Sequence, residues 1–400
     1  MATPTSRPRQ HSPPPGALLL TGPYPPAPPV RRPGSMAGGA GWIHPYGSGR
    51  AVAVVVGGGV AGALIANSLQ SYADVVIIDP KEYLEIPWTN MRSKVEPSVA
   101  EKSLINHSDY LSGQVITASA ADVSGEAVIT AEGRLVEYTY LVIATGHTNQ
   151  CPRTRRDRLE QFQEDDVKIK YSDSILIIGG EPSGVELAAE IAVNYPDKKV
   201  TLVHDRPRLL ESVGQKAGGK ALRWLRSKNV EVYLEQSIHL ESMLEGDRVY
   251  RTSSGIEITA DCHFSCLDRP LSSSWIRNSE LKDCLDNDGR LMVDANLRVK
   301  GQTNIFAAGD IIDIPELEQG YFVQKHAMIV SKNIKLLMHG AKDSKLLKYK
   351  HSTTMPMVSL GKKDAVAQLS LATVLGHLPA MWKSRDLFVH RTRNLLGLPR

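Results

Sequence analysis

The hydrophobic and polar positions of this chain follow one pattern that occurs twice. In its first copy, residues 51–56 are an unbroken run of apolar residues, which ends directly in the glycine-rich sequence 57–62. An amphipathic segment follows, and a second apolar run at 75–78 is closed by Asp79. Short apolar runs bounded by turns are typical of buried strands, so the pattern predicts a strand, a glycine turn, a helix and a second strand.

The second copy lies in the middle of the chain. Residues 174–178, apolar after Ser174, predict a strand that leads into the turn 179–184. An alanine-rich segment at 185–194 predicts a helix, and residues 200–203, apolar except for Thr201, predict the next strand. A repeated strand–turn–helix–strand module is typical of the α/β class. We therefore expect two Rossmann-like dinucleotide-binding domains, one inserted into the other.

The glycines of the first turn have separate physical roles. Gly57 permits a tight turn, Gly59 has no Cβ and lets a pyrophosphate approach the backbone, and Gly62 lets helix and strand pack closely. The start of the following helix offers unpaired N–H groups and a positive dipole end to phosphates. Asp79 is placed to accept hydrogen bonds from a ribose diol. These features predict a dinucleotide site at this turn.

Further segments return the chain to the first domain. Residues 140–143 predict a strand that ends in the turn 144–146, and a charged link at 153–166 leads to the second module. A short strand ends at residues 309–310, and apolar positions at helical spacing predict a helix over 321–339. The predicted units are a tail at 1–48, a first dinucleotide-binding domain at 49–165 and 299–340, an inserted second domain at 166–298, and a small C-terminal α+β region at 341–400.

Composition limits the function classes. The chain has 400 residues, 42% of them hydrophobic, and can bury cores in two or three domains. Its formal net charge of +4 makes nucleic acid an unfavoured partner. The 4 cysteines form no CxxC pair, and the 12 histidines show no metal-ligand spacing. We therefore expect no metal, and isolated thiols in a reducing compartment such as the cytoplasm. No stretch is long enough to cross a bilayer.

Both ends of the chain differ from its middle. Residues 1–50 contain no Asp or Glu and carry proline clusters, which predicts either a disordered tail or an organelle transit peptide; Met36 offers an alternative start. The last residues alternate apolar and basic side chains, which favours either peripheral contact with an anionic membrane or docking on the chain's own domains. These positions are Trp382, Leu387, Phe388, Leu395, Leu396, Lys383, Arg385, Arg391 and Arg393.

Together these motifs resemble a known family. The sequences at 57–62, 91–97, 144–146, 184–186 and 306–310, with Asp79, resemble the pyridine-nucleotide:disulfide oxidoreductase fold. The segments SLGKKDA at 359–365 and SRDLF at 384–388 are similar to the plant branch of the apoptosis-inducing-factor-homologue, or ferroptosis-suppressor, flavoproteins. The resemblance covers residues 50–400. It implies a protein that binds FAD, oxidises NAD(P)H and reduces a quinone without a cysteine pair.

The resemblance also implies roles for individual residues. The first turn, 57–61, would hold the FAD pyrophosphate, and Asp310 would sit near this pyrophosphate and the ribityl chain. Arg92 would contact the flavin nucleotide, and the backbone of Val115 its adenosine end. The FAD-binding residues implied are Gly57, Gly58, Gly59, Val60, Ala61, Gly62, Asp79, Arg92, Val115, Thr145, Gly146 and Asp310. The second module would bind NAD(P)H through Gly179, Gly180 and Gly184. The catalytic candidates are Glu186, on the nicotinamide side, with Lys325 and His326 beside the isoalloxazine ring.

The chain departs from the family pattern on the NAD(P)H side. Glu181 stands where the family has glycine, and Leu267-Asp268 replaces a Thr-Gly turn. Two like charges about 4 Å apart repel by roughly 1 kcal/mol in water and about 4 kcal/mol at a surface-like dielectric. That range corresponds to an affinity loss of about tenfold to about a thousandfold. An outward rotation of Glu181 would reduce the penalty.

Two questions stay open at the level of sequence. His204 occupies the position that matches Asp79, with Asp205 and Arg206 after it, so the second module favours NADH or accepts both nucleotides. The departures at Glu181 and Asp268 also favour an alternative function, an FAD-binding protein with little NAD(P)H turnover that acts through protein partners.

Overall fold

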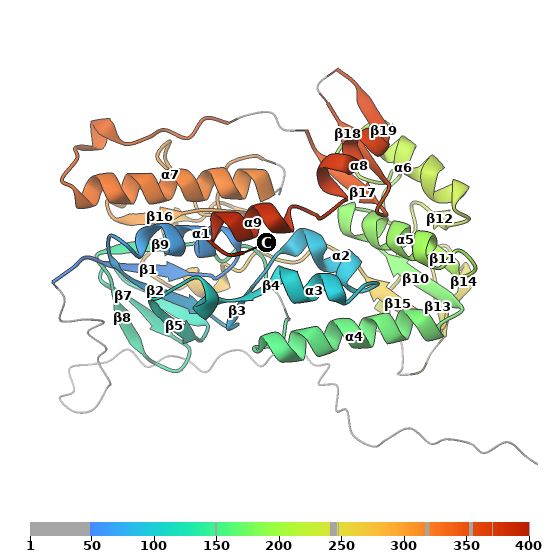
Figure 1. Cartoon of the computed structure of the whole chain (residues 1–400), viewed down its shortest axis with the longest axis horizontal. Coiled ribbons are helices and arrows are strands. Elements are labelled where there is room, and N and C mark those ends of the chain that lie inside the picture. Colours follow the sequence, from blue (N-terminus) through green and yellow to red (C-terminus); the bar gives the residue numbers. More distant parts are fainter. Residues whose placement is uncertain are drawn as a thin grey trace, which may run out of the picture. The chain divides into compact units, whose positions relative to one another are not determined.

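The computed structural model describes residues 49–399, with gaps at 149, 241–245, 247, 317–319, 352–354 and 370. The tail predicted at 1–48 lies outside the described residues. The described part contains two parallel sheets of the kind that the repeated pattern predicts, together with smaller antiparallel sheets (Figure 1).

The first parallel sheet has the strand order β16-β9-β1-β2-β5. Its strands are β1 (Val52–Val56), β2 (Asp74–Asp79), β5 (Gln114–Thr117), β9 (Tyr140–Ile143) and β16 (Ile305–Ala307). Val54 and Val55 are fully buried, because a parallel strand is covered on both faces. Helix α1 (Val60–Leu69) packs against α7 (Gly320–Met338). The return of β16 beside β9 confirms the expected return of the chain to the first module.

The second parallel sheet repeats this arrangement with the order β12-β11-β10-β15. Its strands are β10 (Ser174–Ile178), β11 (Lys199–Val203), β12 (Glu231–Tyr233) and β15 (Cys262–Ser265), and its helices are α5 (Pro182–Asn194) and α6 (Gln215–Ser227). In both modules the first strand pairs in parallel with the second and with a later strand. The predicted α/β class and the internal repeat are therefore confirmed.

Smaller elements complete the two modules. A three-stranded antiparallel sheet contributes Val123, Val128 and Val136 to the core of the first module. Its strands are β6 (Ala120–Val123), β7 (Ala127–Thr130) and β8 (Leu135–Glu137). The other small elements are β3 (Tyr83–Glu85), β4 (Leu104–Asn106), α2 (Asn90–Ser93), α3 (Ser98–Ser103), β13 (Val249–Arg251) and β14 (Glu257–Thr259).

The charged link expected at 153–166 is a long helix, α4 (Arg155–Tyr171). The side chain of Thr154 accepts a hydrogen bond from the Asp157 N–H and caps the helix start. Phe162 and Ile169 are fully buried on one side of the helix. The sequence pattern missed this element because its few apolar anchors stand among many charged residues.

The C-terminal region forms an antiparallel sheet and two short helices. The elements are β17 (Met357–Leu360), β18 (Asp364–Gln368), β19 (Thr373–Gly376), α8 (His377–Lys383) and α9 (Val389–Leu395). The sheet shares a core with the second module, whereas Val389 and Leu396 join the core of the first. The basic stretch expected from residue 382 onward is interrupted at Leu387 and Phe388, which have φ values of +50° and +53°.

Candidate functional site

The two glycine turns have the same backbone geometry. Gly57 and Gly179 have φ values of +101° and +114°, and residues other than glycine rarely adopt this backbone conformation. A Cβ on Gly57 would lie 2.4 Å from the carbonyl oxygen of Ala144, and one on Gly179 would lie 2.5 Å from that of Cys266. Each turn therefore requires glycine for two reasons: its backbone conformation, and the lack of space for a Cβ beside the neighbouring strand end.

The last glycine of each turn lets the helix approach the strand. A Cβ on Gly62 would lie 1.8 Å from the carbonyl oxygen of Gly57, and one on Gly184 would lie 1.8 Å from that of Gly179. These distances are far below any real contact, so the role expected for Gly62 is confirmed and recurs in the second module.

The first turn leaves an open corner at Gly59. A Cβ built on Gly59 would meet no atom within 4 Å. Gly59 precedes α1, which has no side-chain cap and no acidic residue in its first turn. The first N–H groups of a helix have no partner within the helix, and the dipole favours an anion there. The corner therefore fits the pyrophosphate of a dinucleotide such as FAD.

Asp79 and His204 fix the turns from the tips of equivalent strands. The Asp79 carboxylate accepts the Gly58 N–H at 2.5 Å and the Lys81 N–H at 2.7 Å. In the second module, the Gly180 N–H donates to Nδ1 of His204 at 3.1 Å. His204 thus takes over the contact of Asp79 with the turn, but it brings no carboxylate to the ribose position.

His107 is a member of this site that the sequence did not reveal. A Cβ on Gly58 would lie 2.4 Å from its imidazole ring, and its Nδ1 lies 2.6 Å from the Tyr110 hydroxyl oxygen. Burial lowers the pKa of His107 from 6.5 to about 4, so the ring is neutral at neutral pH. Its only sequence signal is a lone histidine between two strands, which carries little information.

Three strand ends meet at the open corner. Gly309 has a φ of +83°, and a Cβ on it would lie 3.5 Å from Cβ of Ala61 in α1. The next residue, Asp310, has its carboxylate 3.6 Å from Nδ1 of His147. The structure therefore brings Asp310 to the end of β9 and the first turn of α1.

The turn after β9 is also joined to the chain that leaves the second module. The Thr145 hydroxyl donates to the carbonyl of Ser272 at 2.9 Å, and the Ser272 N–H donates to the carbonyl of Gly146 at 2.8 Å. Asp268, the acid that replaces the family's glycine, lies near the start of this connection and is exposed. Val115, by contrast, lies in β5 and pairs with Ile77 of β2.

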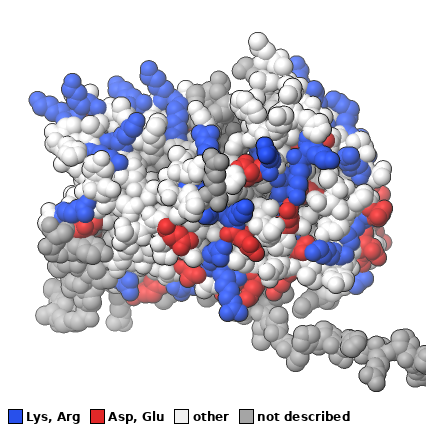
Figure 2. Space-filling view, viewed as in Figure 1, with Lys and Arg blue, Asp and Glu red and all other residues white. Residues whose placement is uncertain are grey.

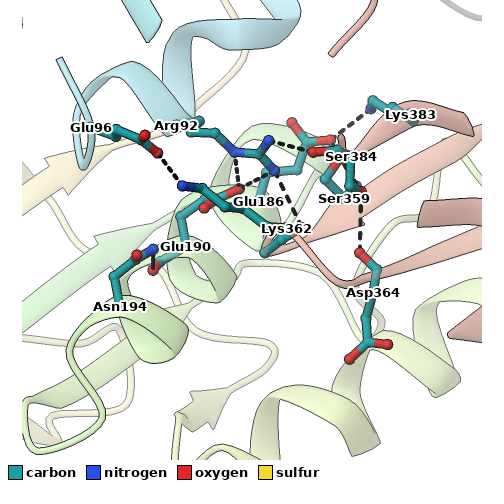
Figure 3. Close-up of polar contacts among 11 residues, drawn as sticks. Arg92, Glu96, Glu186, Glu190, Asn194, Ser359, Lys362, Asp364, Lys383 and Ser384 are labelled. Carbon is teal, nitrogen blue, oxygen red and sulfur yellow. Dashed lines mark hydrogen bonds and ion pairs between the residues drawn. The ribbon is translucent and has the colours of Figure 1, made fainter. Parts of the chain in front are cut away.

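Arg92 and Glu186 belong to a buried polar network (Figure 3). Arg92 is 3% exposed, and its guanidinium donates to Glu190 at 2.8 Å, to the carbonyl of Gly361 at 3.3 Å, and to the carbonyl of Ser384. Burial raises the pKa of Glu190, while Arg92 acts in the opposite direction. The network links α2, α5 and the C-terminal region.

Glu186 lies one helical turn before Glu190 on α5. Its carboxylate accepts the Ser359 N–H at 3.0 Å and the Lys383 ammonium at 2.7 Å (Figure 3). Lys383 also donates to the carbonyl of Met357 at 2.7 Å. The C-terminal region thus fixes the orientation of Glu186 through a backbone group and a cation. The sequence pattern had placed Lys383 among the basic residues of an amphipathic stretch.

Lys325 and His326 lie in the second turn of α7, and His326 is beside the buried carboxylate of Glu316. The Gly309 N–H donates to Nδ1 of His326 at 3.4 Å, and Nε2 of His326 lies 3.3 Å from Glu316. Burial lowers the pKa of His326, and Glu316 opposes this effect. Glu316 also accepts the Tyr349 hydroxyl at 2.5 Å. The Lys325 ammonium donates to the carbonyl of Lys350 at 2.7 Å.

Most of the predicted site residues fall into three groups in the structure. The first group surrounds the open corner and consists of the first turn with Asp79, Thr145, Gly146 and Asp310, and His326 contacts the Gly309 turn from α7. The second group is the buried network at α5, with Glu186 on the helix and Arg92 paired to Glu190. The third group, Gly179, Gly180 and Gly184, forms the second turn. Val115 in β5 and Lys325, which contacts Lys350, lie outside the groups. Sequence reasoning missed His107, Glu190 and Glu316, which contact these groups from distant parts of the chain.

The described residues include all 4 cysteines, which are free thiols. Burial raises the pKa of Cys266 to about 11. The described residues contain no group of three or more His, Cys, Asp or Glu side chains able to hold a metal ion. Among the same residues, no helix combines the length and apolarity that a membrane span requires.

Comparison with known proteins identifies similar chains. The sequence model of a family described as pyridine nucleotide-disulphide oxidoreductase matches residues 52–330. The chain is 29% identical to apoptosis-inducing factor homolog B of Dictyostelium discoideum, over 87% of this chain and 97% of that protein. It is 31% identical to ferroptosis suppressor protein 1 of Taeniopygia guttata, over 86% and 95%.

Two solved structures share the fold. The sulfide:quinone oxidoreductase of Aquifex aeolicus matches with a TM-score of 0.67 and 18% identity, over 86% of this chain and 92% of that chain. NDH2 of Plasmodium falciparum, solved in complex with NADH, matches with a TM-score of 0.63 and 14% identity, over 87% and 97%. At these identities both likenesses concern the fold alone.

Proposed function

Because the chain belongs to the pyridine nucleotide-disulphide oxidoreductase family, we propose that it passes electrons from NAD(P)H through FAD to a quinone. The observation that carries this proposal is the open corner at Gly59, where a helix start without a side-chain cap fits a pyrophosphate. The relatives named ferroptosis suppressor protein 1 and the structural neighbour named sulfide:quinone oxidoreductase support the flavoprotein and quinone parts.

Bound FAD supplies the redox chemistry, and the protein supplies binding, orientation and electrostatics. In the first module, the turn 57–62 would hold the pyrophosphate, and Asp310 would lie near it and the ribityl chain. Thr145 and Gly146 would close the site beside them, Asp79 would fix the turn toward the ribose, and the Val115 backbone would lie at the adenosine end. The pKa of His326 is lowered by burial, and its Nδ1 accepts the Gly309 N–H, which fixes the ring in place. Lys325 would add positive charge near the flavin.

The second module would hold NAD(P)H on the turn formed by Gly179, Gly180 and Gly184. Glu186 would stand on its nicotinamide side, oriented by the Lys383 ammonium and the Ser359 N–H. Arg92 would fix the same region by pairing with Glu190 and with two carbonyls of the C-terminal region.

An apolar surface of the C-terminal region would serve the approach of a lipid-tailed quinone. Leu378, Met381 and Trp382 of α8 are 75%, 70% and 69% exposed, and Leu371 at the end of the β18–β19 hairpin is 97% exposed. Figure 2 shows Lys and Arg side chains beside the uncharged end of this hairpin. Such a combination suits peripheral contact with an anionic membrane from a reducing compartment such as the cytoplasm.

A direct experiment tests the electron-transfer function. The purified full-length protein is expected to be yellow, and anaerobic addition of NADH or NADPH should bleach its visible flavin band. A water-soluble ubiquinone analogue should then restore the band. A colourless protein that stays empty with excess FAD, although circular dichroism shows it folded, would refute the proposal.

Glu181 favours a second candidate function, an FAD-binding protein with little NAD(P)H turnover that acts through partners. Its carboxylate lies in the turn that would hold the nucleotide. In that case dithionite would bleach the flavin, whereas neither NADH nor NADPH would do so within seconds.

A further inference from the structure

The two dinucleotide modules differ at one position of otherwise equivalent turns. Gly59 and Glu181 are the residues that precede α1 and α5, with φ and ψ of −69° and −174° in one and −79° and 178° in the other. A side chain therefore leaves both positions in the same direction. At Gly59 this direction is open, and it is where a pyrophosphate fits. In the second module the carbon chain of Glu181 extends into the corresponding space.

The carboxylate of Glu181 binds to the loop that follows β11. It accepts the Glu211 N–H at 3.0 Å, the Ser212 N–H at 3.3 Å and the Ser212 hydroxyl at 2.5 Å. The Leu210 N–H donates to the carbonyl of Gly180 at 3.0 Å, which holds the same loop against the turn. Two amides and a hydroxyl are donors of the kind that bind phosphate, and here they hold the chain's own carboxylate.

Charges around this contact offer a dinucleotide little compensation. Arg206 lies 3.4 Å and Arg208 3.5 Å from the carboxylate of Glu211. Arg206 also interacts with the charges of Glu181 and Asp205, so the two cations of the loop already face three carboxylates. An incoming pyrophosphate would meet the negative charge of Glu181 next to the helix start. Repulsion between two like charges about 4 Å apart lowers the affinity for the nucleotide by about tenfold or more.

We infer that Glu181 is an internal anion that competes with the pyrophosphate of NADH and NADPH, and that it sets a low affinity of the second module for both. The inference rests on the proposed function for the identity of the nucleotide. It predicts an enzyme with a high KM for its reductant and a normally loaded FAD site, because the first module keeps glycine at the equivalent position.

Equilibrium binding tests the inference without turnover. Isothermal titration calorimetry would measure the Kd of ADP-ribose and of NAD⁺ for the oxidised, FAD-loaded full chain. The variants are Glu181→Gly, which removes charge and volume, and Glu181→Gln, which removes only the charge. Glu231→Gln is the matched control, because Glu231 is an exposed carboxylate on β12 of the same module.

The expected result is a Kd lower by about tenfold or more for Glu181→Gly, a smaller decrease for Glu181→Gln, and no change for Glu231→Gln. The gain from Glu181→Gln should shrink as salt screens the charges. Equal affinities of Glu181→Gly and the wild type, or no measurable binding by Glu181→Gly, would overturn the inference. The visible flavin spectrum of each variant shows that it is folded.

The two proposals fail in distinguishable ways. If Glu181→Gly binds ADP-ribose more tightly but NADH and NADPH reduce neither protein, the proposed function is wrong and the inference stands. If NADH reduces the wild type and Glu181→Gly binds no more tightly, the inference is wrong and the function stands.

Discussion

Replacing Arg92 by methionine tests whether the buried network of Figure 3 carries much of the stability. Glu190 is 2% exposed and has Arg92 as its ion-pair partner. Removing one partner of a buried pair leaves an uncompensated charge and costs about 3–5 kcal/mol. The carbonyls of Gly361 and Ser384 also lose a donor, at about 1 kcal/mol each. A whole domain is stable by only about 5–15 kcal/mol, so the loss would be large.

The double variant Arg92→Met, Glu190→Gln separates charge from packing. Neutralising Glu190 removes the uncompensated carboxylate, so we expect the double variant to be more stable than Arg92→Met alone by about 2 kcal/mol or more. Urea unfolding followed by tryptophan fluorescence would measure both. A double variant no more stable than the single one would refute the reasoning.

The pH dependence of Arg92→Met has a defined sign. Burial already raises the pKa of Glu190, and without Arg92 that pKa rises further. When the pKa of a carboxyl is higher in the folded protein than in the unfolded chain, the folded protein binds the proton more tightly. Stability therefore falls as the pH rises from the pKa in the unfolded chain through the pKa in the folded protein. The penalty of Arg92→Met should therefore be largest near neutral pH and smaller at about pH 5. A penalty that grows toward acid would contradict this account.

Three further predictions concern separate parts of the molecule. Gly62→Ala should abolish stable folding of the first module, because its Cβ would lie 1.8 Å from a carbonyl oxygen, whereas Gly59→Ala should fold and lose FAD affinity; visible spectra and circular dichroism distinguish the two. His107, with a pKa of about 4, should stay uncharged in NMR titrations down to about pH 5. As the pH falls from 6.5 toward 4, the unfolded chain takes up the proton before the folded protein does, so the free energy of unfolding should decrease by up to about 3 kcal/mol. A normal titration near 6.5 would show that the ring is not buried as described. Met381→Glu with Trp382→Glu should reduce co-sedimentation with anionic vesicles and leave reduction of a water-soluble quinone unchanged; unaltered sedimentation would argue against α8 as the contact surface.

Sequence reasoning predicted the modules well because their physics is local. The segments 51–56 and 174–178 are rich in apolar residues and end in glycine, which leaves few alternatives to a buried parallel strand and a tight turn. The structure has parallel strands at Val52–Val56 and Ser174–Ile178. Helix α7 begins one residue before the predicted position. Helix α4 was missed because its buried residues are too few to mark a helical face among its charges.

The sequence predicted the site only where the contacting residues are close together in the chain. The pair between Arg92 and Glu190 joins two elements of different modules, and the carbonyl of Ser384 comes from near the end of the chain. Nothing in the surrounding residues indicates which of many carboxylates pairs with an arginine. The network therefore became visible only when the fold was known, and the same holds for Glu316 beside His326.

The packing of the C-terminal region has a mechanical consequence. Its sheet is built into one nucleotide module and the residues after α8 into the other, while the carbonyl of Ser384 holds Arg92 between them. Rigid-body rotation of one module against the other would have to remove apolar side chains of the C-terminal region from the core of one of the two modules. The end of the chain thus restrains the angle between the modules, in addition to the direct ion pair of Arg92 and Glu190.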